Sequence, residues 1–293
     1  MVRVSARVPA PAKVNLFLHV GTARDDGRHP LDSLVMFADE QACDWLTFSP
    51  ADRISLSVTG PGAVASGAGE ENLVLRAFRA VLEARPDLAP HAMTLDKALP
   101  VAAGLGGGSA DAGAVLRVLG SATGVPDTAL LAIAARLGGD VPACVLAKAC
   151  RMAGDGDRVT PLSGVAALPA LLVNPKIPCP TGPVFRQFDG LGLGAGFSEI
   201  DLTPITGIDP PALIQWLRAN TRNDLEAAAI ARVPAIARVL EALSQLPGAR
   251  LVRMSGSGAS CFVLFDTLDS TRLSHEELFR LQPNWWARPV LLR

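Results

Sequence analysis

The sequence of 293 residues contains no tyrosine, and only 5% of its residues are aromatic. Stacking on a base or a sugar must therefore come from phenylalanine, tryptophan, histidine or the plane of an arginine. The five cysteines include no Cys-x-x-Cys pair, and the four histidines share no metal-ligand spacing. These absences argue against a disulfide framework or a zinc site and favour a reducing compartment, so we expect a cytoplasmic protein.

The sequence also lacks a charge bias and a long apolar run. With 27 basic and 28 acidic residues, it has no global field that would attract nucleic acid or an anionic membrane. No apolar run approaches the ~20 residues of a membrane span, and the N-terminus lacks the apolar core of a signal peptide. We therefore expect a small-molecule partner, without nucleic acid or membrane. The sequence does not predict the oligomeric state.

The first half of the chain mixes strand and helix patterns. Apolar alternation predicts a strand over 12–20, with Lys13 and Asn15 on its polar face, and a turn at Asp26-Gly27 allows 31–37 to return as its partner. Further strands are expected at 53–60 and 92–100, and helices at 69–86, 109–124 and 127–139.

The pattern changes near residue 163. Strands are expected at 168–175, 249–255, 260–266 and 286–292, and helices at 209–220, 224–246 (interrupted at Pro234) and 274–282. The order β-α-β-β-α-β is typical of a ferredoxin-like domain. The Pro/Gly-rich stretch 175–196 is expected to be a functional loop. The chain is thus predicted to be an α+β protein with domains at 1–163 and 164–293.

Residues 100–116 read "PVAAGLGGGSADAGAVL", with four glycines in five positions directly before a predicted helix. Glycines let backbone N–H groups converge on an anion, and a helix N-terminus adds partial positive charge. The segment lacks the lysine of a P-loop, and a dinucleotide fingerprint would need glycine where Ser109 stands. The motifs that accompany a protein-kinase loop are also absent. Phosphate binding is favoured, while tight backbone packing and a dinucleotide site stay open.

Three other features bear on the same chemistry, and each has a structural alternative. Lys13 is either functional or an edge-strand lysine that extends to solvent, and Asp140 is either functional or a helix N-cap. The second glycine-rich turn, in 253–265, is otherwise a plain β-hairpin. Phosphoryl transfer to a hydroxyl needs a carboxylate for its proton, a cation, and backbone donors around the phosphates. Lys13, Asp140 and the 104–109 segment form such a set.

In chain order, "PAKVNLFLHV", "PVAAGLGGGSADAGAVL" and "MSGSGASCFVLF" resemble the three motifs of the GHMP kinases. The resemblance covers essentially the whole chain. It implies a ribosomal S5 domain 2-like N-terminal domain, a ferredoxin-like C-terminal domain and ATP as phosphate donor with Mg²⁺. Additional segments ("DGRHPLDSL", "LGGDVP", "LLVNP" with "PTGPVF", and "NDLE") resemble members that phosphorylate the 2-hydroxyl of 4-diphosphocytidyl-2-C-methyl-D-erythritol (CDP-methylerythritol) in non-mevalonate isoprenoid precursor biosynthesis.

The resemblance also implies roles for individual residues. Asp140 would take the proton of the hydroxyl, and Lys13 would orient that hydroxyl and steady the charge. The ATP-binding residues would be Pro100, Gly104, Leu105, Gly106, Gly107, Gly108, Ser109 and Ala110, with Asn72 and Lys97 on the nucleotide side. The substrate-binding residues would be Asn15, His29, Thr181 and Phe185, together with Arg28, which stands where the family usually has tyrosine. The metal ligands are not assigned, and Ser109 is the best candidate.

Three alternatives remain at this point. A kinase of the same family could act on another small alcohol, such as homoserine or mevalonate. A non-catalytic nucleotide or ligand sensor would be expected to lack Lys13 or Asp140, and both are present. A dinucleotide-dependent oxidoreductase rests on the incomplete fingerprint alone.

Overall fold

Chain packing divides the computed structural model, which describes residues 2–293, into two units. The first unit comprises the chain up to Lys13, Ala42–Val101 and Gly106–Ala147, and the second comprises Val14–Gln41, Ala102–Leu105 and Lys148–Arg293. These units differ from the predicted segments 1–163 and 164–293. The difference arises because residues 31–35 pair with 150–154, and 150–153 pair with 158–161, all in the second unit.

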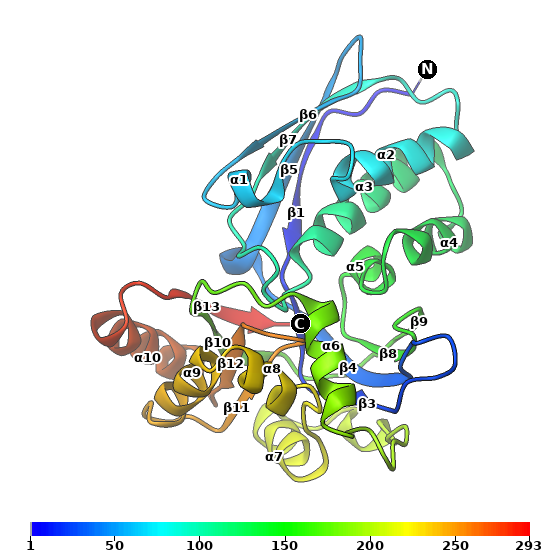
Figure 1. Ribbon diagram of the computed structural model, residues 1–293. Coiled ribbons are helices and arrows are strands. Elements are labelled where there is room, and N and C mark those ends of the chain that lie inside the picture. The colour runs from blue at the N-terminus through cyan, green and yellow to red at the C-terminus, as the bar shows by residue number, and fades with distance from the viewer. Residues whose placement is uncertain (1) are drawn as a thin grey trace. The chain divides into compact units, whose positions relative to one another are not determined.

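The first unit contains one four-stranded sheet with helices packed against it (Figure 1). The sheet order is β1-β5-β7-β6, with β1, β5 and β7 antiparallel in turn and β6 parallel to β7. Helix α3 packs on β1 and β5, and α2 packs on α3. The elements are β1 (Ala6–Pro11), β5 (Cys43–Pro50), β6 (Ser55–Thr59), α1 (Ala63–Ser66), α2 (Leu73–Ala84), β7 (His91–Asp96), α3 (Gly107–Thr123), α4 (Asp127–Leu137) and α5 (Val141–Leu146).

The second unit contains an antiparallel sheet of order β11-β12-β10-β13, with α9 and α10 packed against it (Figure 1). Its strands follow the predicted β-α-β-β-α-β order, and four α-helices separate β10 from β11. The elements are β10 (Leu168–Asn174), α6 (Thr181–Gly190), α7 (Pro210–Asn220), α8 (Glu226–Arg232), α9 (Ala235–Ser244), β11 (Leu251–Met254), β12 (Cys261–Leu264), α10 (Leu268–Leu281) and β13 (Trp286–Leu292).

A further sheet has the order β2-β4-β8-β9, with β3 paired to β4. Its strands are β2 (Lys13–Asn15), β3 (His19–Val20), β4 (Leu31–Phe37), β8 (Cys150–Gly154) and β9 (Arg158–Pro161). The predicted return of 31–37 beside 12–20 is therefore confirmed. The chain passes from the first unit to the second within β2.

Two predicted elements are wrong in detail. The single strand expected over 12–20 is interrupted at Leu16–Phe17, where side chains rather than a strand bind the backbone carbonyls: Arg253 binds that of Leu16 and Ser33 that of Phe17. The loop expected over 175–196 contains α6, because proline is tolerated in the first turn of a helix and Val184 and Phe188 bury one face.

Candidate active site

The glycine-rich segment adopts a backbone that two of its glycines make possible. Gly104 has φ of +75°, and a Cβ atom there would lie 2.3 Å from the carbonyl oxygen of Ser255. Gly106 has φ of +62° and is the N-cap of α3, and a Cβ atom there would lie 3.1 Å from Cε of Lys13. Close packing therefore accounts for glycine at 104 and 106.

The N-terminus of α3 follows at once and has the properties of an anion site. Its first intrahelical bond joins the Ala110 amide to the Gly106 carbonyl at 2.7 Å. The amides of Gly107, Gly108 and Ser109 precede it and belong to the donors that a helix leaves without intrahelical partners. A Cβ atom on Gly108 would make only an ordinary contact, 3.6 Å from Leu73. Packing thus does not require glycine at 108, whereas close approach of a ligand to the backbone would.

Lys13 and Asp140 form an ion pair beside this turn. Nζ of Lys13 lies 3.0 Å from Oδ2 of Asp140, and their side chains are 4% and 36% exposed. Lys13 thus does not extend to solvent. Although Asp140 stands at the N-cap of α5, its side chain makes no capping hydrogen bond. Oδ2 of Asp140 also lies 3.6 Å from the position of a Cβ on Gly106, so the carboxylate faces the start of α3. The structure therefore contradicts a solvent-extended Lys13, while Asp140 occupies the N-cap position without capping α5 through its side chain. Their roles as cation and base stay predictions.

Lys97 lies beside the same turn, and its charge is paired with two buried carboxylates. Its Nζ lies 2.5 Å from Asp44 and 2.6 Å from Asp111. Burial alone would lower the pKa of Lys97, but the two carboxylates outweigh it and the pKa is raised. Burial raises the pKa of Asp111 to about 7, although Lys97 opposes the shift. The Nζ atom also lies 3.0 Å from the position of a Cβ on Gly107, so Lys97 packs closely against the turn.

Asn72 and Pro100, two further residues expected near the nucleotide, have structural contacts in the first unit. Asn72 caps α2, accepting a hydrogen bond from the Val74 amide at 2.9 Å and donating to the Gly67 carbonyl at 2.7 Å. Pro100 is half-buried and follows Leu99, whose amide donates to Asp44 at 2.8 Å. Their roles toward ATP stay predictions.

In the second unit, Asn15 and the turn of the β11–β12 hairpin meet the first part of the glycine-rich segment. The hydroxyl of Ser255 accepts from the Asn15 amide at 3.1 Å and donates to the Gly104 carbonyl at 3.0 Å. Asn223 of the "NDLE" segment donates to the carbonyls of Met254 and Gly256, both at 2.8 Å. The predicted hairpin is confirmed, and its turn also holds the Gly104 backbone.

The expected cytidine-binding residues His29 and Phe185 lie together in the second unit. Their ring centroids are 4.8 Å apart, and Nε2 of His29 lies 2.7 Å from Oδ1 of Asp189. The hydroxyl of Thr181, at the start of α6, lies 2.8 Å from that of Ser257. These positions leave Phe185 half-buried beside the buried His29.

Arg28 does not join this cluster. It is exposed, and its Nη1 lies 3.1 Å from Oδ2 of Asp155. The guanidinium of Arg28, in the loop before β4, is thus held by a carboxylate of the turn between β8 and β9. Neither stacking on a base nor contact with a diphosphate is tested by this arrangement, and both stay predictions.

Several supporting residues were not identified from the sequence. Asp44, Asp189 and Ser255 act through partners that are distant along the chain, and their local sequence carries no signal of that contact. Asp111 is the exception, since it stands within the glycine-rich motif, one helical turn after Gly107.

The residues present fit a magnesium ion carried by phosphates rather than one held by the protein alone. Within residues 2–293, no group of three or more His, Cys, Asp or Glu is placed to hold a metal ion. Mg²⁺ keeps several waters and takes phosphate oxygens as ligands, so a single hydroxyl such as Ser109 is compatible with it. In the same residues, no helix has the length and apolar character that a membrane crossing needs.

Comparison with known proteins agrees with this geometry. Residues 72–148 match the GHMP kinases N terminal domain, and residues 205–276 match the GHMP kinases C terminal domain. A 4-diphosphocytidyl-2-C-methyl-D-erythritol kinase from Hyphomonas neptunium is 53% identical over 260 residues, which are 88% of this chain and 86% of that protein. The enzyme of the same name from Rhodopseudomonas palustris (strain BisB5) is 46% identical, with coverage of 95% and 96%.

Solved structures extend the likeness to three dimensions. A crystal structure of 4-(cytidine 5'-diphospho)-2C-methyl-D-erythritol kinase matches with a TM-score of 0.77 and 32% identity, covering 97% of this chain and 99% of that one. Homoserine kinase from Cytophaga hutchinsonii matches with a TM-score of 0.67 at 18% identity, covering 98% and 95%, which shows a shared fold alone. The chain therefore belongs to the GHMP kinases and, among them, to the family of 4-diphosphocytidyl-2-C-methyl-D-erythritol kinases.

Proposed function

We propose that this protein transfers the γ-phosphoryl group of ATP to the 2-hydroxyl of CDP-methylerythritol. The observation that carries the proposal is the Lys13–Asp140 pair, 3.0 Å apart, beside the Gly106 turn that opens α3. The relatives at 53% and 46% identity, with nearly full coverage, support this substrate over homoserine or mevalonate. The presence of both charged residues argues against a non-catalytic sensor.

Different residues of the site bind the phosphates, accept the proton and stabilise the developing charge. The amides of Gly107, Gly108 and Ser109 bind phosphate oxygens of ATP at the positive end of α3. Asp140 accepts the proton of the acceptor hydroxyl as the oxygen attacks, and Lys13 orients that oxygen and offsets the charge that develops in the transition state. Mg²⁺, bound to the phosphates, would neutralise part of their charge. The half-exposed Asp140 can meet a substrate while the buried Lys13 keeps its carboxylate oriented.

The cytidine group has a separate set of candidates. The Phe185 ring offers a face for stacking, and His29, fixed by Asp189, offers a polar edge for the base. The sequence contains no tyrosine, so stacking must come from phenylalanine, tryptophan, histidine or arginine, and Phe185 and His29 are the pair that lies together.

The test is transfer of labelled phosphate from ATP to CDP-methylerythritol, with homoserine and mevalonate as parallel acceptors. We expect phosphorylation of CDP-methylerythritol alone, at the 2-hydroxyl. Turnover of homoserine or mevalonate without turnover of CDP-methylerythritol would assign the other substrate. Thermal protection by NAD but not by a non-hydrolysable ATP analogue would instead favour a dinucleotide site.

A further inference from the structure

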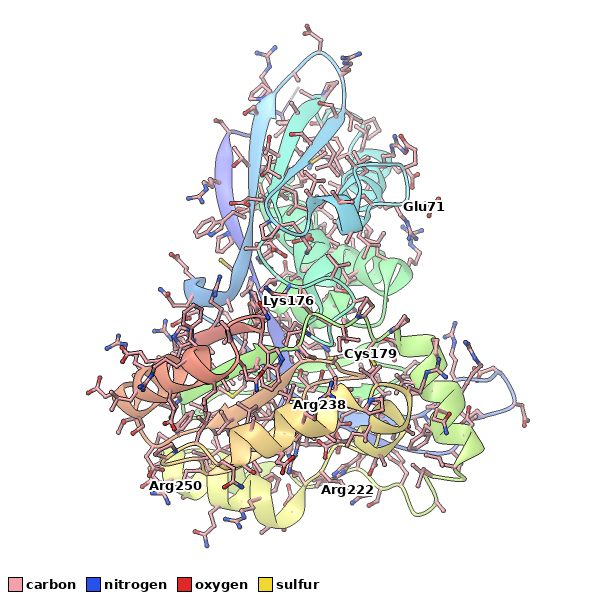
Figure 2. All side chains as sticks on the ribbon, turned by 60° about the vertical axis from the view of Figure 1, so that its left-hand side comes forward. Glu71, Lys176, Cys179, Arg222, Arg238 and Arg250 are labelled. Atoms are coloured by element: carbon pink, nitrogen blue, oxygen red, sulfur yellow. The ribbon has the colours of Figure 1, made fainter. Side chains whose placement is uncertain are left out.

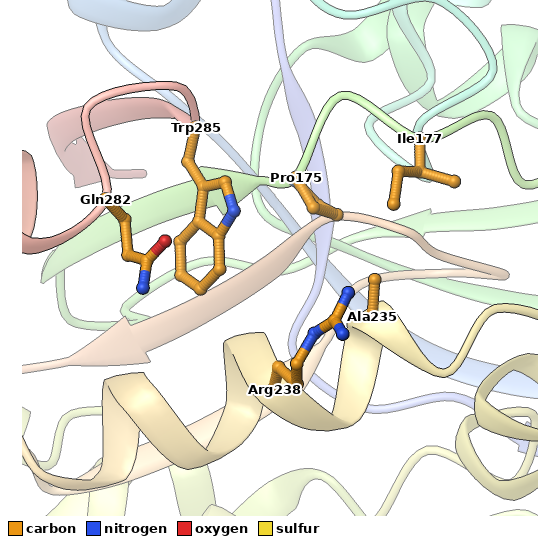
Figure 3. Close-up of a pocket in the computed structure, with 6 residues that line it drawn as sticks. All are labelled: Pro175, Ile177, Ala235, Arg238, Gln282 and Trp285. Carbon is orange, nitrogen blue, oxygen red and sulfur yellow. The ribbon is translucent and has the colours of Figure 1, made fainter.

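A pocket of about 230 Å³ opens on the second unit and shares no residue with the candidate active site. It lies where the loop after β10, the start of α9 and the segment between α10 and β13 come together (Figure 3). The lining residues are Pro175, Ile177, Ala235, Arg238, Gln282 and Trp285.

The lining combines an apolar surface with a cation. The indole of Trp285 and the guanidinium of Arg238 reach into the pocket from opposite sides, with Pro175 and Ile177 beside them (Figure 3). An arginine fork binds a carboxylate or a phosphate through two hydrogen bonds, and an indole stacks on a flat apolar group. Gln282 adds an amide that can donate or accept. The matching ligand is a small organic anion with a flat apolar body.

One wall of the pocket is tied to the glycine-rich segment. Lys176, between Pro175 and Ile177, has φ of +59°, and its amide donates to Oδ1 of Asn174 at 2.7 Å. Nδ2 of Asn174 donates to the Ser260 hydroxyl at 2.9 Å, and the Ser260 amide donates to the Ala103 carbonyl at 3.0 Å. Three hydrogen bonds in sequence, two of them made by the Asn174 side chain, therefore connect this wall to Ala103, the residue before Gly104.

The same stretch is held at its other end. The Cys179 amide donates to the Ala102 carbonyl at 3.3 Å, and its thiol donates to the Ser257 carbonyl at 3.2 Å. Lys176 and Cys179 belong to this stretch, and Arg238 belongs to the facing helix α9 (Figure 2).

The facing wall meets the hairpin turn as well. Ile236 follows Ala235 on α9, and its Cδ1 lies 3.2 Å from the position of a Cβ on Gly258. Both walls of the pocket thus contact the turn 255–260, which in turn holds the backbone at Ala103 and Gly104. A ligand bridging the walls would stabilise this arrangement of the turn.

We infer that this pocket is a regulatory site for a small organic anion with a flat apolar body, and that its occupancy tightens ATP binding by stabilising the arrangement in which the turn 255–260 holds Gly104. Two ligands that favour the same arrangement of the protein bind with positive coupling. The coupling to ATP rests on the proposed function, whereas binding of the anion does not.

The experiment uses the full chain labelled with 5-fluorotryptophan, with the resonance of Trp285 assigned through Trp285→Phe. The probes are phenyl phosphate and benzoate, with benzyl alcohol and inorganic phosphate as the neutral and the purely anionic controls. We expect both aromatic anions to shift the Trp285 resonance saturably, and neither control to do so. In Arg238→Gln the affinity should fall at least tenfold, while the exposed Arg272→Gln on α10 serves as a matched control without effect.

Calorimetric titration with a non-hydrolysable ATP analogue tests the coupling separately. Saturating probe should tighten its binding about fivefold in the wild type and leave Arg238→Gln unchanged. The inference is overturned if the Trp285 resonance does not shift, if the shift survives Arg238→Gln, or if a bound probe leaves the affinity of the analogue unchanged. Failure of the analogue to bind at all, with the Trp285 shift intact, would count against the proposed function instead.

Discussion

Nζ of Lys13, a residue 3% exposed, lies 3.0 Å from Oδ2 of Asp140, whose side chain is 36% exposed. The two residues are 127 positions apart and both belong to the first unit. A buried lysine normally needs a partner for its charge, and this partner leaves one face of its carboxylate available to a substrate. The positive charge of Lys13 is therefore balanced by a carboxylate that a substrate can still reach. Substitutions of the two residues should have different effects on turnover and on folding.

Asp140→Asn should lower kcat by about 10²–10⁴-fold, because the amide cannot accept the proton of the acceptor hydroxyl. Binding of an ATP analogue should remain close to that of the wild type. Steady-state kinetics and calorimetry check the two effects. Asp127→Asn, an exposed change in the first turn of α4, is the matched control and should leave kcat unchanged. A kcat near the wild-type value would remove Asp140 from the role of base.

Lys13→Met should lower turnover by at least about 10²-fold while the protein stays folded, because methionine keeps the apolar stem that packs against Gly106. Loss of the cation removes an interaction that grows as charge develops in the transition state. Circular dichroism and thermal unfolding give the fold, and single-turnover kinetics give the chemical step. Collapse of the fold in Lys13→Met, with normal turnover of the folded fraction, would show that the lysine is structural.

The glycines of the 104–108 segment should separate into packing and ligand positions. Gly104→Ala should destabilise the protein by about 2 kcal/mol or more, since its Cβ would overlap the Ser255 carbonyl at a φ that disfavours side chains. Gly108→Ala, in the first turn of α3, should leave stability equal or higher, since alanine favours helix. It should nevertheless weaken ATP binding about tenfold by blocking approach to the backbone. Equal ATP affinity in Gly108→Ala and the wild type would show that Gly108 is not a ligand position.

The three motifs identified from the sequence include Lys13 and the glycine-rich turn beside it, and Asp140 lies in the separate "LGGDVP" segment. These features are visible along the chain because they are local glycine patterns and single charged residues in apolar surroundings. The partners were not visible. Lys97 is paired with Asp44, 53 residues away, and only the β5–β7 pairing brings the two strands together. The resemblance places Lys97 on the nucleotide side, and the structure shows its charge paired with the buried carboxylates of Asp44 and Asp111. Its role toward ATP stays a prediction.

Helix α6 shows a second limit of sequence reasoning. Its start, "TGPVF", has the proline and glycine that usually mark a loop, so 175–196 was predicted to be one. The helix forms because Pro183 falls in the first turn, where no amide is needed, and because Val184 and Phe188 are buried one turn apart. In α6, the burial of Val184 and Phe188 outweighs the low helix propensity of proline and glycine.

The Lys97 cluster should make stability depend on pH in an unusual direction. The pKa of Asp111 is raised to about 7 from 3.8, so the folded state holds a proton that the unfolded state releases. Between about pH 4 and 7 this group therefore makes the free energy of unfolding fall as pH rises, by at most ~1.4 kcal/mol per unit. Asp111→Asn cannot ionise, so its stability relative to the wild type should improve from pH 5 to pH 7.5. Denaturant titrations at both values measure this difference, and a constant difference between the two proteins would contradict the prediction.

Asp189 should act on the substrate through His29, whose Nε2 lies 2.7 Å from Oδ1 of Asp189. Asp189→Ala should raise the KM for CDP-methylerythritol about tenfold and leave the KM for ATP unchanged, because an unheld imidazole no longer presents a fixed edge to the cytosine. Asp189→Asn keeps an oxygen that can accept from Nε2–H and should restore most of the affinity, which a merely electrostatic role would not allow. Initial rates with each substrate varied in turn separate the two KM values. An equal rise in both KM values would show that Asp189 supports the second unit generally rather than the cytidine-binding residues.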